Sequence, residues 1–175
     1  QIDDANRDRD SYKSRMEDAL AKNASARSKP EESLGNGITR NKLPGFDVLS
    51  VDSAVTFASG SADISKQGQG TLRKVAQIIK NDYGGRPLWI QGHTDDTPIS
   101  KSGFKTNLHL SVARSLSVIE FLTGQCGVPQ SQLICVGRGQ HDPAAKGRSD
   151  VARAKNRRVE VVIATGVQPR PLEIE

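Results

Sequence analysis

The apolar residues from residue 46 onward alternate between two periodicities, and this alternation restricts the fold more than any other feature of the sequence. Short runs with strand-like spacing are separated by two longer stretches in which apolar residues recur every three or four positions. The strand-like runs lie at 46–57, 88–90, 133–136 and 159–163, and the helical stripes lie at 72–79 and 108–122. This order, β-α-β-α-β-loop-β, predicts a mixed α/β domain.

Turn and capping residues give the predicted elements their ends. The first helix is expected to stop near Tyr83, before two glycines. The second is expected to begin with Asn107 as its N-cap, and a further helical turn is expected at 150–155. The first strand is predicted from apolar residues at alternating positions, which would share one face of a strand. They are Leu49, Val51, Val55 and Phe57. The second helix rests on the stripe Leu108, Val112, Leu116, Ile119 and Leu122.

The two ends of the chain differ in composition from this region. Residues 1–42 are rich in charged and small polar residues and hold few sizeable apolar ones, so they are expected to form a linker or stalk, mostly disordered or partly helical. Residues 43–166 are expected to form the folded domain and 167–175 a frayed tail. The chain starts at Gln1, so an export signal or membrane anchor could precede it.

The formal net charge of +5 favours anionic partners. A basic cluster between 146 and 158 could bind nucleic acid, but aromatic residues, which would stack on bases, make up only 4% of the chain. A solvated basic face, or a surface for an anionic cell-wall polymer, fits at least as well. The cluster consists of Lys146, Arg148, Arg153, Lys155, Arg157 and Arg158.

The chain has two cysteines, Cys126 and Cys135, at the end of a predicted helix and in a predicted strand. A disulfide between them and a pair of buried, reduced thiols are both compatible with this placement. The sequence leaves the two interpretations open.

A carboxylate and a guanidinium are expected to meet at one loop-to-helix junction. Asp95 follows the strand at 88–90, and Arg114 lies near the start of the second helix, on the same side as Asn107 and Ser111. Such a pair could hold the ammonium and the carboxylate of an amino-acid zwitterion. The simpler alternative is a surface salt bridge between Asp95 and Arg114.

No pattern in the chain indicates a catalytic or metal centre. Asp95 and Asp96 are adjacent, a spacing that rarely places two carboxylates across a glycosidic bond. The three histidines do not have the spacing of metal ligands, and no phosphate-binding or nucleophile-elbow motif is present. We therefore expect a binding protein without a cofactor rather than an enzyme.

Five sequence blocks in a fixed order resemble the OmpA C-terminal-like peptidoglycan-binding family. The resemblance runs from about Val55 to Ile163. The blocks are Phe57-Ala58-Ser59-Gly60-Ser61-Ala62, the loop Gly92 to Asp95, Asn107-x-x-Leu110-Ser111-x-x-Arg114, Gly137-x-Gly139 with Pro143, and Asn156-Arg157-Arg158-Val159-Glu160.

The resemblance implies a two-layer α/β sandwich, with a four-stranded mixed sheet and helices on one face. It also implies non-covalent binding of peptidoglycan through the diaminopimelate of the stem peptide. Asp95 would take the ammonium and Arg114 the carboxylate. The remaining residues implied at or beside the pocket are Thr94, Asn107, Leu110, Ser111 and Arg158.

Within the family, the segment Thr94-Asp95-Asp96-Thr97-Pro98-Ile99 and the spacer that follows it look most like the periplasmic domain of MotB-type stator proteins. This implies a periplasmic homodimer that anchors an ion-driven inner-membrane complex to the wall, with a channel subunit as partner through an absent N-terminal region. The alternative is an outer-membrane protein or lipoprotein that tethers that membrane to peptidoglycan.

Overall fold

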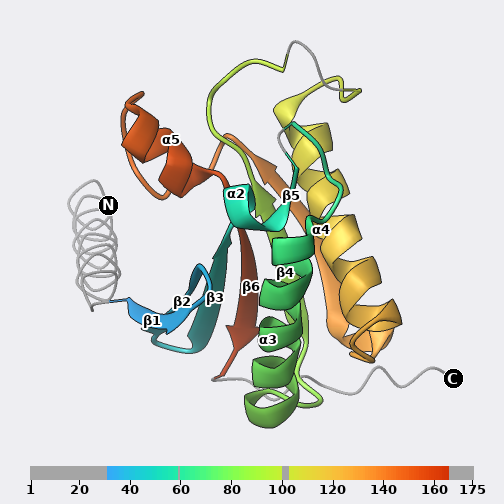
Figure 1. Ribbon diagram of the computed structural model, residues 1–175. Coiled ribbons are helices and arrows are strands. Elements are labelled where there is room, and N and C mark those ends of the chain that lie inside the picture. The colour runs from blue at the N-terminus through green and yellow to red at the C-terminus, as the bar shows by residue number, and fades with distance from the viewer. Residues whose placement is uncertain (1–30, 59, 100–102, 166–175) are drawn as a thin grey trace, which may run out of the picture.

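The structure, a computed structural model, describes residues 31–58, 60–99 and 103–165. One twisted sheet carries two long helices side by side on one of its faces (Figure 1). The helices are α2 (Ser53–Thr56), α3 (Lys66–Asp82), α4 (Asn107–Gly124), the 3-10 turn η1 (Gln130–Gln132) and α5 (Asp150–Asn156). The strands are β1 (Glu32–Gly35), β2 (Ile38–Leu43), β3 (Phe46–Asp52), β4 (Leu88–His93), β5 (Leu133–Gly139) and β6 (Arg158–Ala164).

The sheet has six strands in the order β1-β2-β3-β6-β4-β5. The β4 and β5 strands are parallel, and every other neighbouring pair is antiparallel. The predicted mixed α/β fold with helices on one face is thus confirmed, but the sheet contains β1 and β2 in addition to the expected four strands. Because β6 lies between β3 and β4, the last of the described strands occupies the middle of the sheet.

The two additional strands come from the segment assigned to the linker. Residues 32–43 form β1, β2 and the turn between them, so residues 32–42 of the predicted linker belong to the sheet rather than to a disordered stalk. The turn at 35–37 has positive φ at all three residues, a conformation that glycine and asparagine tolerate best. The remainder of the predicted linker, 1–30, and the predicted tail, 167–175, lie outside the described residues.

The first predicted strand ends earlier than its apolar parity suggests. Asp52 closes β3 and caps α2, because its Oδ1 accepts a hydrogen bond from Ala54 N at 2.7 Å. Val55 therefore lies in a helical turn. Phe57 is buried and forms an isolated β-bridge with Ile64. The expectation of one strand through 57 was wrong because a short polar cap interrupts it.

The helix α3 packs its apolar stripe into the core, as its spacing predicts. Leu72, Val75 and Ile79 are 1% exposed or less. The C-cap is Tyr83, and the chain turns at Gly85 with a φ of 77°. The stripe packs on the inward-facing residues of the central strands, which alternate with outward-facing ones. The inward-facing residues are Leu49, Val51, Leu88, Ile90, Val159, Val161 and Ile163.

The helix α4 lies unusually close to β4 and β5. A Cβ on Gly92 would lie 2.1 Å from Ser111 O, and one on Gly137 would lie 2.3 Å from Val112 Cγ2. This approach buries the small polar side of α4 and leaves Leu108 and Leu116 nearly half exposed. The predicted stripe was therefore only partly right, since the inward face is Leu110, Ser111, Arg114, Ser115, Val118, Ile119, Phe121 and Leu122.

The third and fourth predicted strands and the helical turn at 150–155 are confirmed as β5, β6 and α5. Cys126 and Cys135 are free thiols, each partly buried, so no disulfide joins them in the structure. None of the described helices combines the length and the apolar character needed to cross a membrane.

Candidate functional site

A pocket of about 720 Å³ opens where the loop after β4, the first turns of α4 and the α5–β6 junction meet. These elements gather at the end of the sheet where α2 and α5 lie (Figure 1). Two arginines and one aspartate are the charged residues that line it. The lining is Ser53, Ala54, Phe57, Ala58, Gly60, Asp95, Thr97, Pro98, Ile99, Asn107, Leu110, Arg114 and Arg157.

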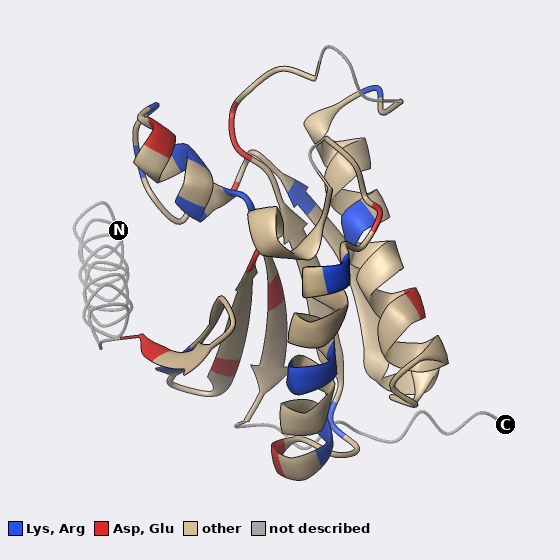
Figure 2. Ribbon diagram, viewed as in Figure 1, with Lys and Arg blue, Asp and Glu red and all other residues tan. Residues whose placement is uncertain are grey.

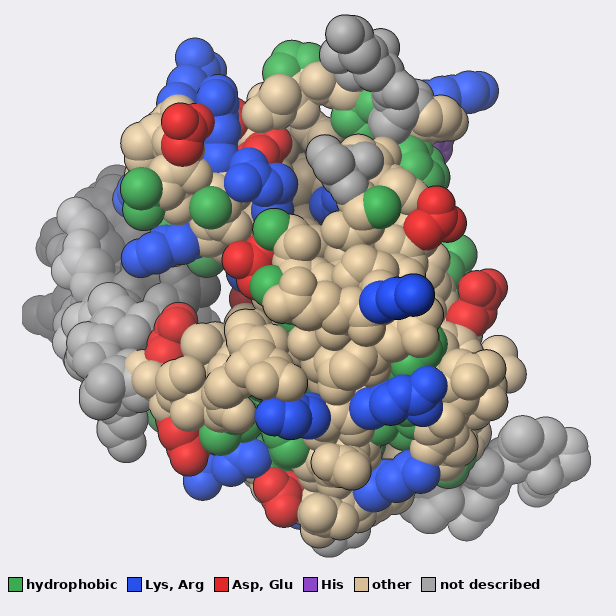
Figure 3. Space-filling model, viewed as in Figure 1, with side chains coloured by type: hydrophobic (Ala, Val, Ile, Leu, Met, Phe, Trp, Pro, Cys, Tyr) green, Lys and Arg blue, Asp and Glu red, His purple; other side chains and the backbone are tan. Residues whose placement is uncertain are grey.

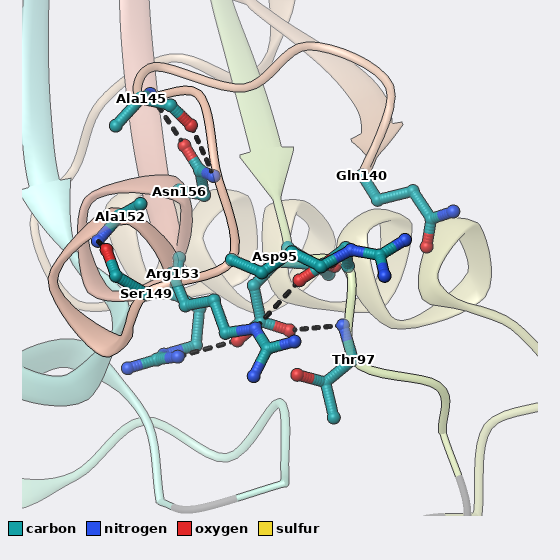
Figure 4. Close-up of polar contacts among 12 residues, drawn as sticks. Asp95, Thr97, Gln140, Ala145, Ser149, Ala152, Arg153 and Asn156 are labelled. Carbon is teal, nitrogen blue, oxygen red and sulfur yellow. Dashed lines mark hydrogen bonds and ion pairs between the residues drawn. The ribbon is translucent and has the colours of Figure 1, made fainter.

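Asp95 is a buried carboxylate in the loop that follows β4. It is 8% exposed, and its Oδ1 accepts a hydrogen bond from Thr97 N at 2.9 Å, a contact drawn in Figure 4. Its Oδ2 accepts one from Arg157 Nη1 at 2.6 Å. Burial alone would raise the pKa of Asp95, but the hydrogen bonds from Arg157 and Thr97 outweigh burial and hold it below its usual value. Asp95 is therefore ionised at neutral pH.

Arg114 projects from α4 into the same pocket and is only 6% exposed. Its Nε donates to Ser61 O at 3.1 Å, and its guanidinium stacks over Phe57 at 5.1 Å from the ring centroid. Within the described part of the chain, no carboxylate forms an ion pair with Arg114. The simple alternative of an Asp95–Arg114 salt bridge is thus not what the structure contains.

The start of α4 supplies two further lining residues. Asn107 is the first helical residue rather than the predicted N-cap, because Thr106 Oγ1 accepts the hydrogen bond from His109 N. The Nδ2 of Asn107 lies 3.0 Å from Thr97 O and 2.8 Å from Gln140 Oε1. It therefore ties the aspartate loop to the helix, while Leu110 lines the pocket wall.

Three residues expected at the pocket lie elsewhere. Ser111 is fully buried and accepts a hydrogen bond from Gly139 N at 3.0 Å, so it joins α4 to β5. Thr94 lines a neighbouring hollow and donates to Asp95 O. Arg158 turns to the sheet face away from α3 and α4, where its Nε donates to Glu160 Oε1 at 2.6 Å.

Arg157, which sequence reasoning missed as a site residue, occupies the place expected for Arg158. Adjacent residues at the start of a strand point to opposite faces, so only one arginine of the pair can reach the pocket. The buried Val159 and Val161 face the helices, and Arg158 and Glu160 therefore face away from them. The parity of β6 was the signal that could have separated the two arginines.

A buried cluster lies beneath the aspartate loop on the opposite face of the sheet. His93, with no exposed surface, places Nε2 3.4 Å from Glu160 Oε2, a contact without hydrogen-bond alignment. Burial alone would raise the pKa of Glu160, but contacts with His93 and Arg158 outweigh burial and lower it to about 2. This cluster joins the end of β4 to the start of β6, the two segments that carry Asp95 and Arg157.

Asp96 points to the basic loop rather than into the pocket. It forms ion pairs with Arg153 at 2.8 Å and Arg148 at 3.2 Å. The hydrogen bond from Arg153 lowers the pKa of Asp96 below its usual value. Lys and Arg residues are concentrated in and around α5 (Figure 2), and Lys and Arg side chains lie on the surface in this region (Figure 3). Asp96 neutralises part of this positive charge.

The loop before α5 is fixed to that helix by a two-way contact. Asn156 Nδ2 donates to Ala145 O at 3.0 Å, and Asn156 Oδ1 accepts from Ala145 N at 2.8 Å (Figure 4). Residues 31–58, 60–99 and 103–165 contain no cluster of three or more His, Cys, Asp or Glu side chains arranged to hold a metal ion. The pocket itself is lined by one carboxylate and two guanidinium groups, an arrangement that suits a ligand carrying both signs of charge.

Comparison with known proteins gives this site a family context. The model of the OmpA family matches residues 56–157, a range that includes Asp95, Arg114 and Arg157. Motility protein B of Bacillus subtilis is 31% identical over 116 residues, which cover 66% of this chain and 44% of that protein. The peptidoglycan-binding protein ArfA of Mycobacterium bovis is 33% identical over 125 residues, 69% of this chain and 36% of that protein.

Solved structures show the same similarity. The periplasmic domain of Helicobacter pylori MotB matches with a TM-score of 0.71 and 28% identity, over 79% of this chain and 88% of that domain. The chain spans about half the length of several of the curated relatives it matches. The similarity therefore concerns one domain of larger proteins.

Proposed function

This chain belongs to the OmpA family and has the fold of a MotB-type periplasmic domain, and from this premise we propose that it binds peptidoglycan through the diaminopimelate of the stem peptide. Asp95 receives the ammonium of the free amino-acid centre, and Arg114 receives its carboxylate. The name of the relative ArfA, a peptidoglycan-binding protein, supports the polymer as the ligand.

The observation that carries this proposal is the state of Arg114. Its guanidinium is buried in the pocket wall, and no carboxylate of the described residues pairs with it. Burial, followed by the positive charge of Arg157, lowers the pKa of Arg114 to about 10, although Asp95 acts in the opposite direction. A buried cation without a counter-ion is costly, and a ligand carboxylate would remove that cost.

We propose binding without chemistry. A general acid for glycosidic cleavage needs a carboxyl group whose pKa is raised. Both Asp95 and Asp96 have lowered pKa values because each accepts a hydrogen bond from an arginine. Neither carboxyl would carry a proton at neutral pH, which supports an anchoring role in place of hydrolysis.

The larger assembly that we propose is a MotB-like stator of the inner membrane, in the periplasm, with a channel subunit joined through a segment outside this chain. The similarity to motility protein B and to the MotB periplasmic domain supports it. An outer-membrane protein or lipoprotein of the same family is the alternative, and membrane fractionation of the full-length protein separates the two.

We further propose a homodimer whose contact is the sheet face away from α3 and α4. A groove of about 440 Å³ lies there, lined mostly by apolar residues together with the polar Gln91 and one charged residue, Arg138. Phe46 and Ile134 on the outer surface are more than 40% exposed. A second copy presents the same apolar, weakly charged face, which makes the contact self-complementary.

The direct test is co-sedimentation with diaminopimelate-type sacculi. Asp95→Asn and Arg114→Gln should each weaken binding about 10- to 100-fold, because each removes a charge-assisted contact. Arg148 lies outside the pocket and its side chain is 86% exposed, so the Arg148→Gln variant should bind like the natural chain. Undiminished binding by both pocket variants, or salt-sensitive oligonucleotide binding that depends on Arg148, would contradict the proposal.

A further inference from the structure

The charges that line the pocket do not match a simple zwitterion. Asp95 supplies one negative charge, whereas Arg114 and Arg157 supply two positive charges. The other lining residues are uncharged. An amino-acid centre with one ammonium and one carboxylate would leave one positive charge in the pocket without a counter-ion.

Arg157 has donors to spare. Within the described residues, the one hydrogen bond of its side chain is the contact from Nη1 to Asp95. The side chain is 38% exposed, so a ligand can reach it from the pocket mouth. An arginine presents five N–H donors in a planar fork, and a carboxylate can accept two of them at once.

The two arginines also repel each other. The positive charge of Arg157 contributes, after burial, to the lowered pKa of Arg114. Asp95 opposes this effect but is already paired with Arg157. One bound carboxylate relieves part of the repulsion, and a second would neutralise the excess charge.

We propose that Arg157 is a second carboxylate receptor, so the ligand that fits this pocket carries one ammonium and two carboxylates. This inference rests on the proposed binding of diaminopimelate stem peptides. It makes the site specific for a charge pattern, in which Asp95 holds the ammonium, Arg114 the carboxylate beside it, and Arg157 a further carboxylate of the same peptide.

Two groups of an uncross-linked stem peptide can supply that second carboxylate. One is the α-carboxylate of the glutamate that precedes diaminopimelate. The other is the second carboxylate of diaminopimelate itself, which is free when the stem ends at that residue. Both place an anion within one residue of the zwitterionic centre, and amidation removes the charge of either with little change in shape.

The experiment is a charge-deletion cycle measured by calorimetry with the whole chain. The ligands are the tripeptide alanyl-γ-glutamyl-diaminopimelate and two forms of it, amidated at the glutamate α-carboxylate or at the terminal diaminopimelate carboxylate. The proteins are the natural chain, Arg157→Gln, Arg157→Lys and Arg148→Gln. Thermal melting of each variant checks that it is folded.

For the natural chain, one of the two amidations should weaken binding about 10- to 100-fold. The Arg157→Gln variant should bind the unmodified tripeptide more weakly than the natural chain does, by a similar factor. It should also bind the unmodified tripeptide and that amidated form with equal affinity. Arg157→Lys should retain part of the discrimination, since it keeps the charge but loses the fork. Arg148→Gln, with the same loss of net charge outside the pocket, should behave like the natural chain.

Equal affinity of the natural chain for all three ligands would overturn the inference and leave the zwitterion pocket standing. Discrimination that survives Arg157→Gln would overturn it as well, because another group would then read the second carboxylate. No binding of the tripeptide by the natural chain would overturn the proposed function, and this inference with it.

Discussion

The backbone of Ser111 in α4 lies so close to Gly92 in β4 that a Cβ on this glycine would be 2.1 Å from Ser111 O. Two glycines, Gly92 and Gly137, therefore allow the helix to rest almost directly on the strands. This approach sets the height of Arg114 above the end of β4, and hence its distance from the aspartate loop.

Gly92→Ala should lower the free energy of unfolding by about 1–3 kcal/mol or more, because backbone atoms must move apart to admit the methyl group. Gly70→Ala is the matched control, since its Cβ would meet open space in α3. Helix propensity should make that variant about 0.5–1 kcal/mol more stable. Urea denaturation measures both, and equal stability of the two variants would contradict the close approach.

Glu160 should give the domain a defined acid sensitivity. Its pKa in the folded state, about 2, lies below the ordinary value of 4.5. The stabilisation is therefore complete above pH 4.5 and disappears as pH falls from 4.5 toward 2, with a total of about 3 kcal/mol.

Glu160→Gln should remove most of the pH dependence of stability between pH 4.5 and 2, measured by chemical denaturation at several pH values. Asp63→Asn serves as a control on the surface, where the carboxylate pairs locally with Ser61. An unchanged slope in Glu160→Gln would show that Glu160 is not held by His93 and Arg158.

Arg114→Gln should separate binding from stability. The change removes a buried cation whose contacts are one carbonyl and one aromatic face, so the free energy of unfolding should change by about 1 kcal/mol or less. Binding to sacculi should nevertheless fall at least tenfold. A large loss of stability in this variant would indicate a structural role for the side chain.

Both cysteines should react as thiols without added reductant. Burial raises the pKa of Cys126 and of Cys135, so alkylation should be slow in the folded chain and rapid after unfolding. Thiol titration in denaturant should count two groups, and the melting temperature should be the same with and without reductant. Fewer than two thiols would show that a disulfide forms in solution.

Trp89→Ser should reduce self-association if the outer sheet face is the homodimer contact. Trp89 lines the apolar groove on that face and is the only tryptophan of the chain. Sedimentation at several concentrations should show a dimer for the natural chain and a monomer for the variant. The fluorescence of Trp89 should shift to longer wavelength on dilution, and a monomeric natural chain would refute the proposed contact.

Much of this fold could be predicted because apolar periodicity follows burial. The strands β4, β5 and β6 and the helix α3 lie where their patterns place them, and β3 begins at the expected position but ends at Asp52. The β1–β2 hairpin could not be found in this way, because Ile38 is its one fully buried residue and the neighbouring positions are polar. Edge strands of this kind gain stability from backbone pairing, which leaves no apolar signature.

The sequence predicted only part of the pocket lining. Asp95, Arg114 and Asn107 share one pocket, as loop position and helical spacing indicate, and Leu110, which the family resemblance implies, lines it as well. Ser111 has the same spacing but is buried between α4 and β5, since the glycines bring these elements together. Close approach between helix and strand depends on backbone contacts that side-chain periodicity does not describe.

The β1–β2 hairpin also has a mechanical consequence. The described chain enters the sheet through β1, its outermost strand, which has only three paired positions with β2 and a break in register. A pull on residue 31, resisted at the pocket, would load this weak ladder first. Detaching residues 32–43 would extend the chain by about 40 Å, while β3 would stay paired with β6 and the pocket would keep its walls. Under such a pull, the hairpin would thus constitute a reserve of length between the applied tension and the pocket.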